Sequence, residues 1–108
     1  MGNRVNLYRW DALPLERITE MVARKVVASD ETRLTQAYLK KGAIVPLHTH
    51  AGDVMIYVLQ GALRARIDGD DITVREGDVV VVPAGAAHQT ESLEDTFVLT
   101  VSEGGEGT

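Results

Sequence analysis

With 108 residues, 44% of them hydrophobic, the chain is long enough to bury the core of one globular domain and too short for two. Its formal net charge of −5 and its scattered 11 lysine and arginine residues argue against nucleic acid as the main partner, since phosphate binding needs a clustered basic surface. The absence of cysteine excludes disulfides, thiolate ligands and a cysteine nucleophile, so any metal must bind to nitrogen and oxygen.

Membrane and secretion signals are not found in the sequence. No apolar run approaches the roughly 20 residues of a membrane span, and the N-terminal sequence MGNRVNLYRW lacks the apolar core of a signal peptide. We therefore expect a cytoplasmic protein that binds neither membranes nor nucleic acids.

Short apolar or alternating segments, separated by turn signals, predict an all-β fold of antiparallel strands. In chain order, the predicted strands cover residues 21–28, 33–40, 55–59, 63–67, 72–74, 79–82 and 96–101. The sequence DGDD at 68–71 predicts a hairpin turn, and the four valines at 79–82 predict a strand buried on both faces. Residues 14–20 carry a weak helix signal. Basic pairs such as Arg24 with Lys25 are interpreted as solvated strand ends.

Strands at these spacings predict a sandwich or barrel. The expected organisation is an N-terminal arm over residues 1–20, a β-barrel over 21–102 and a flexible C-terminal tail over 103–108. The tail sequence, EGGEGT, is too polar and too rich in glycine to pack.

Three histidines, His48, His50 and His88, are the candidate functional residues. Residues two apart on an extended strand project to the same face, so His48 and His50 can present two imidazoles to one cavity. An isolated H-x-H pair also fits surface histidines. His88, however, follows a valine strand and a Pro83-Ala84-Gly85 turn, which fixes the backbone and directs the third imidazole.

These residues together resemble the two motifs of the cupin family, which read G-x5-H-x-H-x3-4-E-x6-G and G-x5-P-x-G-x2-H-x3-N. The matching positions are Gly42, His48, His50 and Gly61 for the first motif, and Gly77, Pro83, Gly85 and His88 for the second. The resemblance implies a single-domain jelly-roll barrel, the double-stranded β-helix. Two positions depart from the pattern: the glutamate position falls on Val54, with Met55 as the one-residue alternative, and the asparagine position falls on Ser92.

The resemblance implies that His48, His50 and His88 bind a divalent transition metal (Zn, Fe, Ni, Mn or Cu), with positions left open for water or substrate. Without the carboxylate the centre carries a charge of about +2 instead of about +1, which favours an anionic, chelating ligand. Acetylacetone dioxygenase is a cupin that holds iron with three histidines alone. Asp53 could be a fourth ligand only if Gly52 allowed a bulge, and we expect a solvated loop carboxylate instead.

Within the family, the sequence most resembles the short cupins of pectin breakdown, which help to open unsaturated uronate rings. The shared segments are RKVV, YLKKGAIVPLHTH, YVLQGALRARIDG and LEDTFVL. That group is expected to have a glutamine at the fourth ligand position and Asp-Val-Phe near the end of the last strand. This chain has Val54 and, at the end, Thr100, Val101 and Ser102, so the resemblance implies the fold and the cavity and leaves the reaction open.

Several other side chains are weak candidates. Tyr38 and Gln36 share one face of a predicted strand and could orient a ligand, although Tyr38 also fits a core aromatic with its hydroxyl at the rim. A second set is expected to lie in a loop, with a role in orienting an imidazole as the alternative: Gln89, Thr90 and Glu91. Arg64 and Arg66 alternate with apolar residues and are expected to be solvated, with a cavity-facing pair for a carboxylate substrate as the alternative.

Two functional hypotheses follow. No G-x-S-x-G and no G-x-G-x-x-G is present, so neither a serine triad nor a nucleotide cofactor is indicated. The first hypothesis is a metal-dependent isomerase, lyase or dioxygenase that acts on a small, anionic organic acid or sugar-derived carbonyl compound. The second is a non-catalytic barrel with a vestigial or empty metal site, in which Val54 and Met55 line an apolar pocket for a small ligand.

The resemblance also implies a homodimer, because small cupins commonly cross their N-terminal strands between subunits. Residues 5–12, which include Tyr8 and Trp10, would contribute to that contact. The alternative is that this segment packs against its own barrel.

Overall fold

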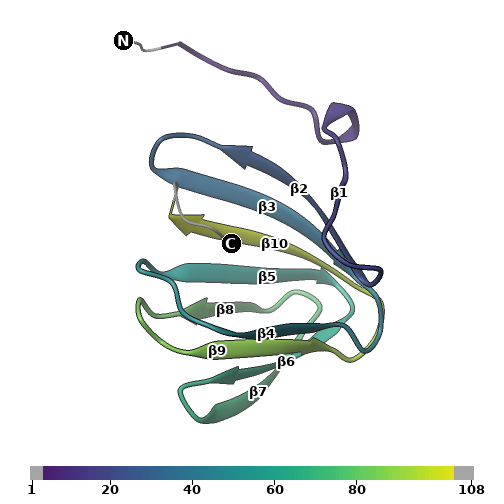
Figure 1. Cartoon of the computed structure of the whole chain (residues 1–108), viewed down its shortest axis with the longest axis vertical. Coiled ribbons are helices and arrows are strands. Elements are labelled where there is room, and N and C mark those ends of the chain that lie inside the picture. The colour runs from purple at the N-terminus through teal and green to yellow at the C-terminus, as the bar shows by residue number, and fades with distance from the viewer. Residues whose placement is uncertain (1–3, 104–108) are drawn as a thin grey trace.

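The computed structural model describes residues 4–103, in which nearly all regular structure is β-strand (Figure 1). A single turn of 3-10 helix, η1 (Trp10–Ala12), precedes the strands. The strands are β1 (Glu16–Arg17), β2 (Val22–Ala28), β3 (Thr32–Leu39), β4 (Ile44–His48), β5 (Val54–Gln60), β6 (Ala62–Ile67), β7 (Asp70–Arg75), β8 (Val79–Val82), β9 (His88–Ser92) and β10 (Thr96–Glu103). No helix within residues 4–103 is long and apolar enough to cross a membrane.

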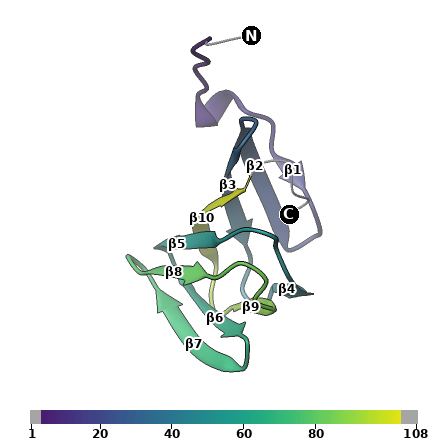
Figure 2. The same cartoon turned by 90° about the vertical axis from the view of Figure 1, so that its left-hand side faces the viewer.

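The strands form two antiparallel sheets between which the chain passes repeatedly (Figure 2). One sheet has the order β1-β2-β3-β10-β5-β8, and the other has the order β4-β9-β6-β7. Consecutive strands from β3 to β6 lie in alternate sheets, and so do β7 to β10. This alternation is the jelly-roll arrangement, which confirms the predicted all-β jelly-roll fold.

The core lies between the two sheets because the strands alternate in burial. On β5, Val54, Ile56 and Val58 are buried, whereas Met55 and Tyr57 are exposed on the outer face. The other sheet supplies a small set of buried apolar side chains to the same core, Leu63 and Ala65 on β6 and Val74 on β7. Successive side chains on a strand point to opposite faces of the sheet, so buried apolar residues alternate with residues that face solvent.

All seven predicted strands are confirmed, with bounds within two residues of those expected. The predicted turn at DGDD is also confirmed, although β7 already begins at Asp70. Asp68 and Gly69 both have positive φ, at 47° and 88°. Positive φ at both central residues is the requirement of the tight hairpin turn that matches the twist of its strands.

Two predictions about the strands and the arm are wrong. β8 lies at the edge of its sheet, so Val79 and Val81 are 55% and 51% exposed instead of buried. Residues 14–20 contain the short strand β1, paired with β2, and no helix. β10 extends to Glu103, one residue into the predicted tail, and residues 104–108 lie outside the described part of the chain.

Candidate metal centre

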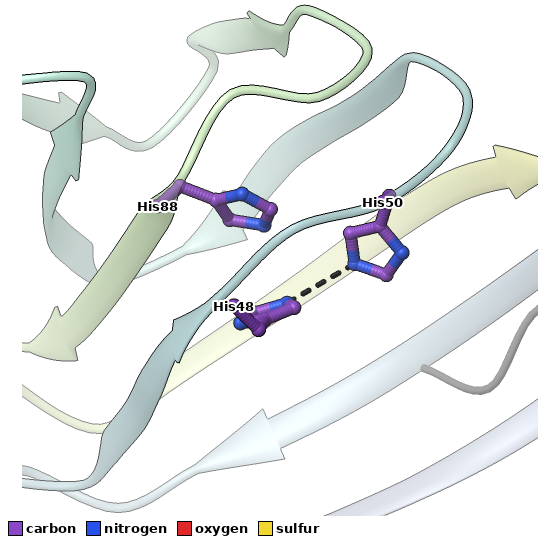
Figure 3. Close-up of side chains that lie close together, drawn as sticks. All are labelled: His48, His50 and His88. Carbon is purple, nitrogen blue, oxygen red and sulfur yellow. Dashed lines mark hydrogen bonds between the residues drawn. The ribbon is translucent and has the colours of Figure 1, made fainter.

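The three histidines converge on one point between the sheets (Figure 3). His48 ends β4, His88 begins β9, and the two residues are paired across these strands. His50 lies two residues beyond β4, so it reaches the site from a loop and not from the strand that its spacing predicts. Nitrogen atoms of all three rings lie within 4.8 Å of one another. The predicted convergence in one cavity is therefore confirmed.

Backbone carbonyls fix the orientation of two of the rings. Nδ1 of His48 lies 2.7 Å from the carbonyl oxygen of Pro46, and Nδ1 of His88 lies 3.1 Å from that of Ala86. A carbonyl oxygen can only accept a hydrogen bond, so each Nδ1 carries the proton and each Nε2 keeps its lone pair. Metal-binding histidines are held in the same way.

The contact between His48 and His50 has the dimensions of two neighbouring metal ligands. Their Nε2 atoms lie 3.0 Å apart (Figure 3). Two nitrogens that each bind a metal at about 2.0 to 2.1 Å lie about 2.9 to 3.4 Å apart, for angles between square and tetrahedral. The widest separation in the group is larger, up to 4.8 Å, so one ring must rotate slightly to complete a site. With that adjustment the donor set fits a divalent ion.

Burial keeps His88 in the form that a metal requires. The side chain is buried, and this loss of hydration lowers the pKa of His88 below its ordinary value. The hydrogen bond to Ala86 raises the pKa in part, while His48 and His50 lower it further. At neutral pH the His88 imidazole is therefore uncharged.

Two hydrogen bonds hold the loop of His50 against the turn that leads to His88. The carbonyl oxygen of His50 accepts from the amide of Gly85 at 2.8 Å. The carboxylate of Asp53 accepts from the amide of Ala84 at 2.9 Å. Asp53 is exposed and lies outside the histidine group, as expected, yet it also has this structural role.

A cavity of about 330 Å³ surrounds the histidines and is lined by both sheets. Its walls are mainly apolar, and Val54 is part of them, 3% exposed. Its polar lining, apart from the histidines, consists of Thr19, Arg24, Thr35, Thr90, Thr100 and Ser102. No aspartate or glutamate is among the described residues that line it. Met55, in contrast, is 48% exposed on the outer face, so its predicted place in the pocket is wrong.

Tyr38 and Gln36 lie on the wrong face of β3 to act on a ligand. The cavity is lined by the alternate residues of this strand, which include Thr35. The Tyr38 ring stacks on Phe97 at 4.7 Å, and its hydroxyl donates to Gln36 Oε1 at 3.3 Å. The interpretation of Tyr38 as a core aromatic is also wrong, since it is exposed on the outer face.

The prediction of a loop after His88 is wrong, because Gln89, Thr90 and Glu91 belong to β9. Thr90 is buried and lines the cavity. On β6, Arg64 and Arg66 are solvated as expected, and Nε of Arg64 donates to the Asp71 carboxylate at 3.0 Å.

Arg24 is a charged lining residue that sequence reasoning missed. Its interpretation as a solvated strand end is wrong, because it faces the cavity together with Val22. The alternation of Val22, Arg24 and Val26 along one strand was the available signal, since residues two apart share a face.

Comparison with known proteins supports this description of the fold. Residues 36–102 match the sequence model of the family described as Cupin domain. KdgF from Halomonas sp. has a TM-score of 0.87 at 23% identity, over 95% of this chain and 96% of that one. An RmlC-like cupin from Shewanella frigidimarina has the same TM-score at 19% identity, over 98% and 96% of the two chains.

Two larger proteins contain a similar unit. Oxalate decarboxylase from Bacillus subtilis has a TM-score of 0.81 at 24% identity, over 100% of this chain and 32% of that chain. A gentisate 1,2-dioxygenase from Streptomyces sp. is 29% identical over 59 residues, which are 54% of this chain and 16% of that protein. The match thus spans about a sixth of the length of this curated relative.

Proposed function

The chain belongs to the cupin family, and from that premise we propose that it is a small metalloprotein in which His48, His50 and His88 bind a divalent transition metal. The observation that carries the proposal is the convergence of three ring nitrogens within 4.8 Å, two of the rings being fixed by backbone carbonyls. Zn, Fe, Ni, Mn and Cu all accept imidazole ligands. The similar oxalate decarboxylase contains Mn(II) centres, which supports a metal in this position.

The proposed reaction acts on a small anionic organic acid or sugar-derived carbonyl compound. When bound, the metal would supply a Lewis acid that polarises a carbonyl or enolate oxygen. The three neutral imidazoles add no negative charge, and Val54 stands where the family pattern has a carboxylate, so the site favours an anion. The mainly apolar walls would limit the hydration of a ligand bound there.

Isomerase, lyase and dioxygenase reactions are all compatible with this arrangement. Two of the similar proteins are named as a decarboxylase of oxalate and a dioxygenase of gentisate, both organic acids, which supports the proposed substrate class. Proton transfer at the cavity would depend on hydroxyls or bound water, because the described lining contains no carboxylate and the three imidazoles are the proposed metal ligands.

That lack of a carboxylate favours a second candidate function, a barrel that binds a small ligand without catalysis. A general acid or base usually lies within hydrogen-bonding distance of the reacting group. In this alternative the metal site is vestigial or empty, and the apolar cavity alone holds the ligand.

Metal analysis of protein purified without an affinity tag tests the proposal. We expect about one divalent ion per chain, lost in His48→Ala, His50→Ala and His88→Ala and retained in the cavity-wall control Thr90→Val. Metal-free protein that resists reconstitution would refute it. Oxygen uptake with diketone substrates should then be compared with uronate ring opening under nitrogen, since only a dioxygenase consumes oxygen. Absence of both reactions in metal-loaded protein favours the binding function.

The homodimer stays a prediction. Val5, Leu7 and Tyr8 of the arm are exposed, so they are free to contact a second copy. The arm also touches its own barrel, where Nζ of Lys25 donates to the carbonyl oxygen of Trp10 at 2.7 Å. Light scattering at several protein concentrations measures the oligomeric state.

A further inference from the structure

Arg24 places a permanent positive charge in the wall of the histidine cavity. Arg24 lies on β2 and is paired with Ala37 of β3, and both residues line the cavity. Its side chain is only 19% exposed. Apart from the histidines, which are neutral when they bind a metal, Arg24 is the one basic residue in the described lining.

The ion pair of Arg24 leaves part of its guanidinium free. Nε donates to Oε1 of Glu16 at 2.9 Å, and no other hydrogen bond joins this guanidinium to a described residue. Arginine has five N–H donors in a fixed plane, so the edge formed by its two Nη groups can still bind a carboxylate through two parallel bonds. Glu16 itself is 54% exposed, and a pair that reaches the surface contributes little to stability.

The position of Arg24 implies a ligand with two separated polar ends. Arg24 lies on β2 of one sheet, whereas His48 and His88 lie on β4 and β9 of the other sheet. All three residues line the same cavity. Packed sheets lie about 10 Å apart, so a ligand that touches both Arg24 and the histidines must reach across the cavity. Thr35 and Thr100, which are paired across β3 and β10, also offer hydroxyls to the cavity.

We propose that the Nη edge of Arg24 binds a carboxylate of the ligand whose other end lies at His48, His50 and His88. The substrate class is then a linear organic acid with a chelating group, such as a 2-oxo acid, at one end and a second carboxylate several carbons away. This assignment rests on the proposed metal site and narrows its substrate. Glu16 holds the guanidinium in place and weakens binding of the ligand by charge repulsion.

Binding of two matched probes tests the assignment. 2-Oxoadipate and 2-oxohexanoate have the same chelating end and chain length, but only the first has a distal carboxylate. In metal-loaded wild-type protein, we expect calorimetry to show at least about tenfold tighter binding of 2-oxoadipate, the size of a charge-assisted hydrogen bond. Arg24→Gln should remove this preference while metal content stays unchanged.

Three further variants sharpen the test. Glu16→Gln keeps a hydrogen-bond acceptor for Nε and removes the negative charge, so 2-oxoadipate should bind several-fold more tightly. Arg24→Lys keeps the positive charge but not the planar guanidinium, so the preference for 2-oxoadipate should be partly retained. This variant replaces Arg24→Gln in the test if Arg24→Gln fails to fold. Arg17→Gln, on the exposed strand β1, is the matched control and should behave as wild type.

The same samples separate failure of this assignment from failure of the proposed function. Equal preference in wild-type protein and Arg24→Gln, with metal bound in both, refutes the role of Arg24 alone. Wild-type protein that binds no metal refutes the proposed function, and with it the two-ended ligand. As a readout independent of metal, adipate should raise the melting temperature of metal-free wild-type protein more than that of Arg24→Gln. An equal rise also contradicts the assignment.

Discussion

The carboxylate of Asp53 accepts a 2.9 Å hydrogen bond from the amide of Ala84, and so joins the His50 loop to the turn that leads into His88. Asp53→Ala leaves this amide without its partner and allows the two ligand-bearing segments to separate. We expect metal affinity to fall by about tenfold with the stoichiometry unchanged, the usual effect of losing a residue that orients the ligands. Titration against a chelator measures the affinity.

The control for Asp53 is Asp30→Ala, which removes an exposed carboxylate between β2 and β3. It should leave the metal affinity at the wild-type value. An unchanged affinity in Asp53→Ala would show that the bond between Gly85 and His50 is sufficient to hold the two segments together.

Position 61, between β5 and β6, requires glycine because of its backbone conformation and because of its close neighbours. Its φ is +92°, and a Cβ added there would lie 2.5 Å from the carbonyl oxygen of Asp95 and 2.5 Å from Oγ1 of Thr96. Gly69 has a similar φ of +88° but open space around it. Gly69→Ala should therefore cost about 1 to 2 kcal/mol, the strain of the left-handed conformation. Gly61→Ala should cost clearly more, because the backbone must also shift.

Urea denaturation of the two glycine variants measures both changes. A loss of stability at Gly61 no larger than at Gly69 would mean that the β5–β6 turn relaxes easily around the new methyl group.

Most of the fold was predictable from the sequence because its signals are local. Alternation of apolar and polar residues locates β3 and β6, and the Asp68-Gly69 pair locates a hairpin. The burial of β8 was not predictable in this way, since a run of four valines fits a central strand as well as this edge strand. Whether a strand lies at the edge or in the centre of a sheet depends on pairing between distant segments. The periodicity of the sequence does not indicate that pairing.

The sequence predicts the candidate metal ligands but not most of the residues that line the cavity. His48, His50 and His88 were identified from motif spacing, which reflects the loop and turn geometry that brings them together. The predicted faces of Tyr38 and Arg24 are both wrong, because alternation defines two faces of a strand without indicating which one faces the cavity. Only the packing of the second sheet decides that question.

Tyr38 and Thr35 lie on opposite faces of β3, so their variants should have opposite effects. Tyr38→Phe keeps the stacking on Phe97 and removes a hydroxyl on the outer face, so ligand and metal binding should not change. Thr35→Val keeps the shape of a buried side chain that lines the cavity and removes its hydroxyl. It should weaken binding of 2-oxoadipate several-fold if the ligand uses that hydroxyl. Weaker binding in Tyr38→Phe would contradict the placement of the cavity.

Val54 is the residue that distinguishes this site from the four-ligand pattern of the family, and it faces the cavity with 3% exposure. Val54→Glu should place a carboxylate beside the three histidines. Without metal, the carboxylate would be buried in a mainly apolar wall and should destabilise the fold by several kcal/mol. With metal, a fourth ligand should increase affinity and reverse much of that loss, so the gain in melting temperature on adding Mn(II) or Zn(II) should exceed the wild-type gain.

Met55→Glu is the matched control, because Met55 is adjacent in sequence and 48% exposed on the outer face. That carboxylate stays in water, so the variant should fold without metal and gain no more from metal than wild-type protein does. The carboxylate introduced by Val54→Glu also reduces the positive charge of the centre by one, which should weaken binding of an anionic chelator such as 2-oxoadipate. A Val54→Glu protein that metal does not stabilise would show that position 54 lies too far from the histidines to complete their coordination.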